Sequence, residues 1–289
     1  MAHDTFRAGD LTAIIGDNAA FEQHRAGYNG VWSLTHRTEP TNLFVPAVAG
    51  LNFEHIFDGE RFDRDRSNRI FFEPRNARMN FRRISDTSAE LHQPPTPTFA
   101  IESWTRFTLV APHYIDMTFR FIATQHLFTN GYIGLFWASY MNAPDDKSMY
   151  FRGQRRWQQL CTQQHNDEST VRHVDDKLDL RFHKEFPPCL FRNFSPMRFD
   201  EPFFYGQFRN HVAIVMFDRM EGIRFTHSPS GGGVNATAET TNPAWDFQYL
   251  VPRYEVKREY QFRLRLAYRP RCSRTEIVQE VAAWRKSLT

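Results

Sequence analysis

The strictest constraint on the fold is a two-residue alternation of apolar and polar side chains from residue 113 to residue 121. The apolar members stand at every second position: Ile115, Met117, Phe119 and Phe121. Successive side chains of a β-strand point to opposite faces, so these residues share one face, and Asp116 and Arg120 share the other. The pattern predicts a strand that packs its apolar face on a core.

Segments of similar length follow along the chain, separated by Gly, Pro, Asp and Asn. They are residues 31–53, which combine strands and loops, and 69–74, 132–142, 169–174, 177–183, 203–217, 222–228, 245–251 and 259–268. This spacing predicts an all-β fold, a large antiparallel β-sandwich, and the 28 phenylalanines suit sheet faces that pack on each other. No repeat of fixed period is visible, which disfavours a propeller or a solenoid.

A single domain is expected for the whole 289-residue chain, with three departures from the strand pattern. Residues 1–30 contain a short helical candidate, which is expected to cap the sandwich. Residues 85–98 include three prolines and predict a surface crossover, with a domain linker as the alternative. Residues 273–288 predict a C-terminal helix, because Ser273 and Glu276 have the spacing of a capping box. That helix is expected to dock on the sheet exterior or on a second subunit, forming a homodimer.

Composition excludes some classes of partner. The formal net charge is only +3, and arginines are scattered among acidic residues rather than gathered in a stripe, which argues against a nucleic-acid interface. No apolar run approaches the roughly 18 residues that a membrane span needs, and the start of the chain has no secretory apolar segment. We therefore expect a cytoplasmic protein with no membrane partner. The three cysteines are widely spaced and are expected to be reduced structural thiols.

The motifs of common enzyme classes are absent from the sequence. There is no Walker loop, no GxGxxG after a strand, no GxSxG elbow and no HExxH. The clearest polar feature is a loop with His227, Ser228 and Ser230 beside three glycines, followed by Trp245 and Asp246. Strands this regular need no such loop merely to reverse direction. The sequence therefore predicts the edge of a polar-ligand site here.

Histidines at strand ends supply candidates for proton transfer. His113 and His227 are the strongest, because each stands beside a strand that also carries an arginine. Arg120 or Arg224 could stabilise a developing oxyanion or hold a uronate carboxylate. Further candidates for substrate binding are His36, Arg37, His55, Asp116, Trp137 and Trp245, the tryptophans as stacking surfaces for a pyranose ring. For each of these residues, packing in the core or solvation at the surface is the alternative.

Metal binding has weaker support in the sequence. His55 with Glu54, or His173 with Asp175 and Asp176, could supply ligands, but neither set has a diagnostic spacing. We predict no cofactor and no metal-ligand residues, with a divalent metal as the alternative.

The strand-rich organisation of residues 31–270, with NPAWDFQYLVPRYEVKREYQFRLRLAYRP near its end, resembles uncharacterised bacterial proteins of the galactose-mutarotase-like β-supersandwich superfamily. Aldose epimerases and domains of polysaccharide lyases and glycosidases use this fold. The resemblance implies an acid and a base around a sugar ring oxygen. Glu239 or Asp246 would then be the acid, and His113 or His227 its partner.

Three hypotheses about function follow. The first is an enzyme that acts on a sugar or sugar acid by proton transfer, as an epimerase, a mutarotase or a β-eliminating lyase. It requires a concave face on which His113, His227 and an arginine meet Trp245. The second is a non-catalytic carbohydrate-binding module, and the third is a structural or assembly protein that dimerises through its terminal helix.

Overall fold

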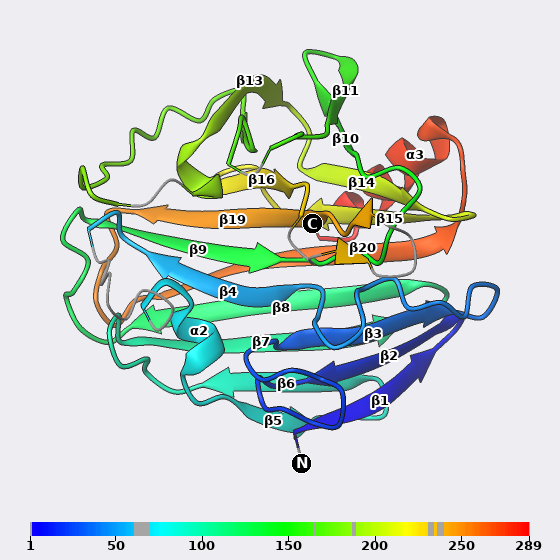
Figure 1. Cartoon of the computed structure of the whole chain (residues 1–289), viewed down its shortest axis with the longest axis horizontal. Coiled ribbons are helices and arrows are strands. Elements are labelled where there is room, and N and C mark those ends of the chain that lie inside the picture. Colours follow the sequence, from blue (N-terminus) through cyan, green and yellow to red (C-terminus); the bar gives the residue numbers. More distant parts are fainter. Residues whose placement is uncertain are drawn as a thin grey trace.

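The fold is described from a computed structural model, which covers residues 2–60, 70–164, 166–186, 189–230, 234–235 and 240–288. Within these residues the protein is built from two large β-sheets, a smaller sheet of three strands and a short two-stranded ribbon. Figure 1 shows the three-stranded sheet in the lower part of the view and the C-terminal helix at the upper right. No helix of the described part is long and apolar enough to cross a membrane.

The larger sheet has nine described strands, and all neighbours in it are antiparallel. In order across the sheet they are β11 (Arg156–Leu160), β10 (Met149–Gly153), β14 (Phe203–Phe208), β15 (His211–Phe217), β20 (Glu259–Pro270), β8 (Tyr114–Ala123), β7 (Ile101–Val110), β6 (Ser88–Gln93) and β5 (Asn80–Arg83). The predicted antiparallel β-sandwich is thereby confirmed.

The second sheet has six described strands and one parallel pair, β12 with β13. Its order is β13 (Phe194–Phe199), β12 (Thr170–His173), β16 (Ile223–Ser228), β19 (Ala244–Pro252), β9 (Tyr132–Ala138) and β4 (Asn52–Phe57). The remaining elements are β1 (His3–Ala8), β2 (Leu11–Gly16), β3 (Gly30–His36), α2 (Glu73–Asn76), the 3₁₀ turn η1 (Leu190–Arg192), β17 (Val234–Asn235), β18 (Thr240–Thr241) and α3 (Arg274–Lys286).

The hydrophobic core fills the space between the two large sheets. Trp137 of β9 is fully buried and stacks on Phe247 of β19, with 5.0 Å between ring centroids. From the opposite sheet, Phe119 of β8 and Phe262 of β20 meet it edge-on at 4.7 Å and 5.1 Å. Aromatic rings from both inner faces interdigitate, which joins the sheets into a sandwich.

Strand β8 confirms the alternation in the sequence. Its inward residues are all 0% exposed: Ile115, Met117, Phe119 and Phe121. Asp116 and Arg120 lie on the other face, which is half-buried. The two-residue period therefore identified both the strand and its core face.

The helix expected within residues 1–30 is wrong, because this segment forms the antiparallel strands β1 and β2. Leu11, Ala13 and Ile15 are buried at every second position, a strand period that outweighs the helical propensity of Ala and Leu. Gly9 turns the chain between the strands with φ of +57°, and a Cβ there would lie 2.3 Å from the Pro112 carbonyl oxygen.

Two other local expectations also needed correction. Within the proline-rich stretch 85–98, Ser88–Gln93 is strand β6, and the three prolines follow it. Proline removes ladder hydrogen bonds only where it stands, so a strand can end directly before it. The strand expected at residues 69–74 is absent from its described part, where Glu73–Asn76 form α2, with Pro74 at a helix start that tolerates proline.

Helix α3 begins at the predicted capping box. The Ser273 hydroxyl accepts a hydrogen bond from the Glu276 backbone at 3.2 Å, and the Glu276 carboxylate accepts one from the Ser273 backbone at 2.8 Å. Ile277, Val281 and Trp284 are buried against the outer face of the nine-stranded sheet. The helix thus docks on the sheet exterior, and dimerisation through it stays a prediction.

Candidate functional site

The outer face of the six-stranded sheet is polar although it is buried. Arg224 on β16 and Gln248 on β19 are 0% exposed, and Asp246 on β19 is 1% exposed. Their strand neighbours Phe225 and Phe247 point the other way, into the core. Burying polar groups is unfavourable unless they find partners, so this face needs an explanation beyond stability.

A cavity of about 280 Å³ lies on this face over β4, β9, β16 and β19. Its polar lining includes Glu54, His55, Arg75, Tyr140, Ser228 and Asp246. Its aromatic lining includes Tyr28, Phe71, Phe72, Phe136 and Phe191. The volume lies near the lower end for small-molecule pockets, so the cavity suits a compact ligand.

A β-bulge in β4 places two neighbouring ionisable residues in the cavity. Phe53 pairs with Trp137 of β9, and His55 pairs with Phe136, the residue next to Trp137. Glu54, between Phe53 and His55, therefore has no partner residue in β9. Regular alternation would send Glu54 and His55 to opposite faces, and a bulge changes the direction of a side chain locally. Both residues line the cavity as a result.

The Glu54 carboxylate is buried among hydrogen-bond donors. Asn52 donates its Nδ2 hydrogen at 2.9 Å, and the Tyr140 hydroxyl also donates to it. His55 Nε2 and Arg75 Nη1 lie 3.3 Å and 3.9 Å from Oε1. Burial raises the pKa of Glu54, but the contacts with His55 and Arg75 outweigh it and hold that pKa below 4.5. Glu54 is therefore ionised at neutral pH.

Asp246 has the opposite environment in the same cavity. Its Oδ1 accepts a hydrogen bond from the Ser139 backbone at 3.0 Å. Complete burial, reinforced by the negative charge of Glu54, raises the pKa of Asp246 well above 3.8. Asp246 thus keeps its proton to a higher pH than Glu54 does.

Aromatic rings hold the basic side chains of the cavity in place. The Arg75 guanidinium lies 3.9 Å from the centroid of the Tyr28 ring and 4.7 Å from that of Phe72, and its Nε donates to the Gly27 carbonyl at 3.0 Å. His55 Nδ1 contacts the Phe71 carbonyl oxygen. Stacking and hydrogen bonding together orient the Arg75 guanidinium and the His55 imidazole toward Glu54.

Among the residues that the structure describes, neither a reactive thiol nor a metal cluster accompanies these groups. Burial raises the pKa of the Cys189 thiol in the cavity wall, which keeps it protonated and unreactive. Within the described residues, no group of three or more His, Cys, Asp or Glu side chains is placed to hold a metal ion. His55 Nε2 contacts the Glu54 carboxylate at 3.3 Å, and Asp176 pairs with Arg224.

Among the predicted site residues, Asp246 and His55 line the cavity, whereas His227 and Trp245 do not. His227 stands opposite Trp245 in the β16–β19 ladder, and both donate a ring hydrogen to the Lys147 carbonyl at 2.9 Å. Thr162 approaches His227 Nδ1 at 2.8 Å, and burial lowers the pKa of His227 to about 4. The imidazole is neutral and fully bonded at neutral pH, which suits a structural role.

His113 lies elsewhere, beside the C-terminal helix. Its Nε2 is 4.0 Å from Glu280 of α3. The expected meeting of His113 with His227 and Trp245 is not found, because His113 precedes β8 in the nine-stranded sheet, whereas the other two lie on the six-stranded sheet.

The remaining candidates fall in several separate places. Asp116 pairs with Arg265 through two contacts of 2.6 Å and 2.7 Å, and Arg120 pairs with Glu259 at 3.0 Å, both on the outer face of the nine-stranded sheet. Trp137 lies in the core.

The predicted residue His36 ends β3 of the three-stranded sheet and Arg37 follows it, and neither lines the cavity. His36 Nδ1 lies 3.2 Å from His211 Nε2, and the exposed Arg37 pairs with Asp10 at 2.7 Å. Glu239 and residues 231–233 lie outside the described residues.

Arg75, Tyr140 and the aromatic residues that line the cavity were not predicted from the sequence as site residues. Glu54 was predicted only as a possible metal ligand. One available signal was the pair Glu54 and His55 inside the otherwise apolar run FEHIF. Arg75 comes from α2 and Tyr140 follows β9, so only the fold brings them to the same carboxylate.

No protein-family model matches the sequence, and no curated protein matches it. Solved structures do resemble the fold at low identity. A putative aldose 1-epimerase from Escherichia coli K12 is 12% identical over 93% of this chain and 99% of its own, with a TM-score of 0.52. A protein from Synechocystis is 9% identical over 93% and 96%, with a TM-score of 0.53.

A mutant of the heparan sulfate lyase HepC from Pedobacter heparinus is 11% identical over 94% of this chain but 36% of the lyase, with a TM-score of 0.50. These structures share the sandwich architecture and almost none of the sequence. The chain therefore has a fold similar to that of the putative aldose 1-epimerase and of the other two structures.

Proposed function

We propose that the protein is a carbohydrate-directed enzyme that moves protons on a sugar bound in the cavity. The observation that carries this proposal is the contrast between Glu54 and Asp246. They face the same cavity, and their surroundings move their pKa values in opposite directions. A protonated acid and an ionised base within one site are what general acid/base catalysis requires at neutral pH.

In the proposed reaction, Asp246 donates a proton while Glu54, with His55 beside it, accepts one. For an aldose, the proton from Asp246 goes to the ring oxygen as the bond from that oxygen to the anomeric carbon breaks. The base takes the anomeric hydroxyl proton, and the electron pair of that O–H bond forms the carbonyl of the open-chain sugar. Closure on the other face of the carbonyl reverses both transfers.

Elimination from a uronate would use the same two groups. The base would remove the proton from the carbon next to the carboxylate, and the electron pair of that C–H bond would form a carbon–carbon double bond. The acid would protonate the leaving oxygen as its bond to the sugar breaks. The similar structures include one named a putative aldose 1-epimerase and one named a heparan sulfate lyase, which supports both reactions as candidates. Fold alone does not select between them.

The aromatic wall supports a sugar as the ligand. Phe71, Phe72, Phe136 and Phe191 present apolar rings beside the polar groups of the cavity floor. A pyranose has an apolar face and a rim of hydroxyl groups, which matches such a mixed surface. The same wall favours the second candidate, a non-catalytic carbohydrate-binding module, which needs stacking rings but no acid and base.

Two isosteric substitutions separate these candidates. Glu54→Gln and Asp246→Asn each remove one proton-transfer group with little change of shape. Turnover would be followed with aldoses by polarimetry and with uronate-containing polysaccharides by the absorbance of the new double bond. We expect each variant to lose about 10²–10⁴-fold in rate and to bind the sugar still.

Glu255→Gln is the matched control, because Glu255 is 67% exposed and pairs only with the exposed Arg258 among the described residues. Its rate is expected to equal that of the wild type. Sugar binding with no turnover in any form would establish the binding module instead. Wild-type turnover in both cavity variants would disprove the proposed acid and base.

A further inference from the structure

Three arginines lie in register across neighbouring strands of the six-stranded sheet. Arg172 of β12 stands opposite Arg198 of β13 on one side and opposite Arg224 of β16 on the other. Residues directly opposite in a ladder point to the same face, so these three side chains form one row. We call Arg172, Arg198 and Arg224 the arginine row.

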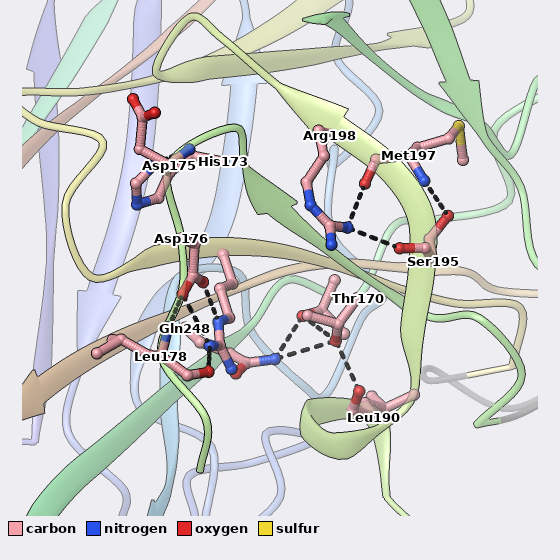
Figure 2. Close-up of polar contacts among 12 residues, drawn as sticks. Thr170, His173, Asp175, Asp176, Leu178, Leu190, Ser195, Met197, Arg198 and Gln248 are labelled. Carbon is pink, nitrogen blue, oxygen red and sulfur yellow. Dashed lines mark hydrogen bonds and ion pairs between the residues drawn. The ribbon is translucent and has the colours of Figure 1, made fainter.

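The row carries more positive charge than its surroundings neutralise. Arg224 pairs with Asp176 at 2.6 Å and 3.2 Å, the only ion pair that the row makes within the described part of the chain. Arg198 donates instead to the carbonyl oxygens of Ser195 and Met197, each at 3.1 Å, as Figure 2 shows. Neutral carbonyl groups leave its charge uncompensated.

Unpartnered nitrogen atoms remain in the row. Among the described residues, Arg224 Nη1 and Arg172 Nε are buried and have no hydrogen-bond partner. Arg224 itself is 0% exposed. Buried donors of this kind are rare in folded proteins, and each one needs a reason for its retention.

The surrounding structure keeps the guanidinium groups in place. The Phe194 ring lies 4.3 Å from Arg172 and 5.0 Å from Arg224, measured from each guanidinium carbon to the ring centroid. Burial lowers the pKa of Arg198 and of Arg224, and the charge of Arg172 adds to both effects. This mutual repulsion is unfavourable in the free protein, and an anion bound to the row would relieve it.

We propose that the arginine row is an anion-binding site for a carboxylate or sulfate group of an acidic saccharide, a ligand that rests on the carbohydrate function proposed above. Guanidinium forks match planar carboxylates and sulfate oxygens through paired hydrogen bonds. Arg172 and Arg198 are half-buried, so an anionic group can reach them from solvent.

The position of the row relates it to the cavity. Arg224 and the cavity residue Ser228 lie on the same face of β16, four residues apart, which corresponds to about 13 Å along a strand. That separation exceeds one sugar ring. The anionic group therefore belongs to a sugar unit other than the one in the cavity, and the preferred ligand is an acidic oligosaccharide.

The first test uses sodium sulfate as the probe and the melting temperature as the readout. Sulfate would be titrated at millimolar concentrations against chloride of equal ionic strength, which controls for charge screening, and saturation of the response separates binding from the general stabilising effect of sulfate. We expect a saturable rise in melting temperature for the wild type. Arg172→Gln and Arg198→Gln should remove that rise, whereas the control Arg82→Gln, at an exposed arginine of the other sheet, should keep it.

Arg224 is left unchanged in this test because its loss would strand the buried Asp176 carboxylate. A linear, unsaturated response in the wild type would mean that no site exists. An equal saturable rise in the Arg172 and Arg198 variants would place the anion elsewhere. Either result overturns the proposal.

The second test identifies the source of the anion and separates this inference from the proposed function. Oligosaccharides of glucuronate and matching neutral oligosaccharides would be titrated into the wild type and Arg198→Gln. The inference predicts at least tenfold tighter binding of the acidic form by the wild type and a loss of that preference in the variant. Equal affinity for both forms in the wild type contradicts an acidic saccharide, even if inorganic sulfate binds.

The Glu54→Gln variant completes the separation. It should lose turnover and keep the sulfate response, because Glu54 is not part of the arginine row. A sulfate response without any sugar turnover would mean that the proposed function fails and the anion site stands. Sugar turnover without a sulfate response would mean that the proposed function stands and the anion site fails.

Discussion

The two faces of the six-stranded sheet are both buried and yet chemically opposite. On β19, Phe247 enters the ring cluster around Trp137, and its neighbour Asp246 enters a cavity with Glu54. The inner face gains stability from apolar area removed from water. The outer face places ionisable groups where burial is unfavourable for their charges. The inner face therefore accounts for folding, and the outer face is where we look for function.

The largest predicted effect is on the inner face. Trp137→Ala should lower the free energy of unfolding by about 3–5 kcal/mol, because it removes a fully buried ring and leaves a cavity between the sheets. Denaturant unfolding followed by circular dichroism would measure this. Trp137→Phe should lose much less. A loss below about 1 kcal/mol for the alanine variant would contradict the role of this ring as the centre of the core.

A smaller loss of stability is expected from a substitution at the start of helix α3, which covers the outer face of the nine-stranded sheet. Helix α3 covers that face with apolar residues, and its first turn depends on Ser273. Ser273→Ala should destabilise the protein by about 0.5–2 kcal/mol through loss of the cap. Ser287→Ala, at the other end of the helix, is the control. Equal melting temperatures for the wild type and Ser273→Ala would show that the cap adds nothing to docking.

Buried polar groups outside the cavity should affect stability rather than activity. His36 on β3 and His211 on β15 are each 3% exposed, and burial lowers the pKa of both below 6.5. Asp10 and Glu39 face this pair and oppose the shift, but burial is the larger effect. The unfolded chain therefore binds more protons than the folded protein at acid pH.

The sign of the pH effect follows from that difference. Stability from this pair is complete above the unfolded pKa of about 6.5 and is lost as the pH falls toward the lower folded values. Urea unfolding at pH 5 and pH 7 should show the loss, and His211→Gln should reduce it. A variant with the full wild-type pH dependence would mean that other groups cause it.

The smallest effect on stability is expected inside the cavity. Burial raises the pKa of Asp246 and so favours its neutral form, which Asp246→Asn reproduces with a neutral group of similar shape. Its free energy of unfolding should stay within about 1 kcal/mol of the wild type while its turnover falls. A loss of several kcal/mol would assign Asp246 to the structural residues and remove the contrast between the two faces.

The strand pattern predicted the fold because strand alternation is local and repeats along the chain. The two-residue period gave β8 and its core residues directly. The prediction of a short helix within residues 1–30 failed, because β1 and β2 form there and pair with each other. In a sheet, pairing with a neighbouring strand overrides weak local propensity.

The site was harder to predict because it depends on long-range contacts. Asp246 and His55 were among the residues chosen from the sequence, but the bulge that aims Glu54 and His55 together is visible only in the pairing with β9. His227 stood in the most distinctive loop, and the structure shows it fully bonded to Thr162 and the Lys147 carbonyl. Sequence cannot tell a bonded histidine from a free one.

The measurement that tests the account most directly is a thermal-shift titration with saccharides of the wild type and Ala138→Leu. Ala138 lines the cavity from β9, so a leucine there fills part of the space that a sugar would occupy. A ligand at a hundredfold excess over its dissociation constant stabilises the folded state by about 2.7 kcal/mol. If the cavity binds a sugar, that sugar should raise the melting temperature of the wild type and should change the melting temperature of Ala138→Leu very little. An equal rise in both proteins, or none with any saccharide, would contradict the assignment of the outer face as the functional site.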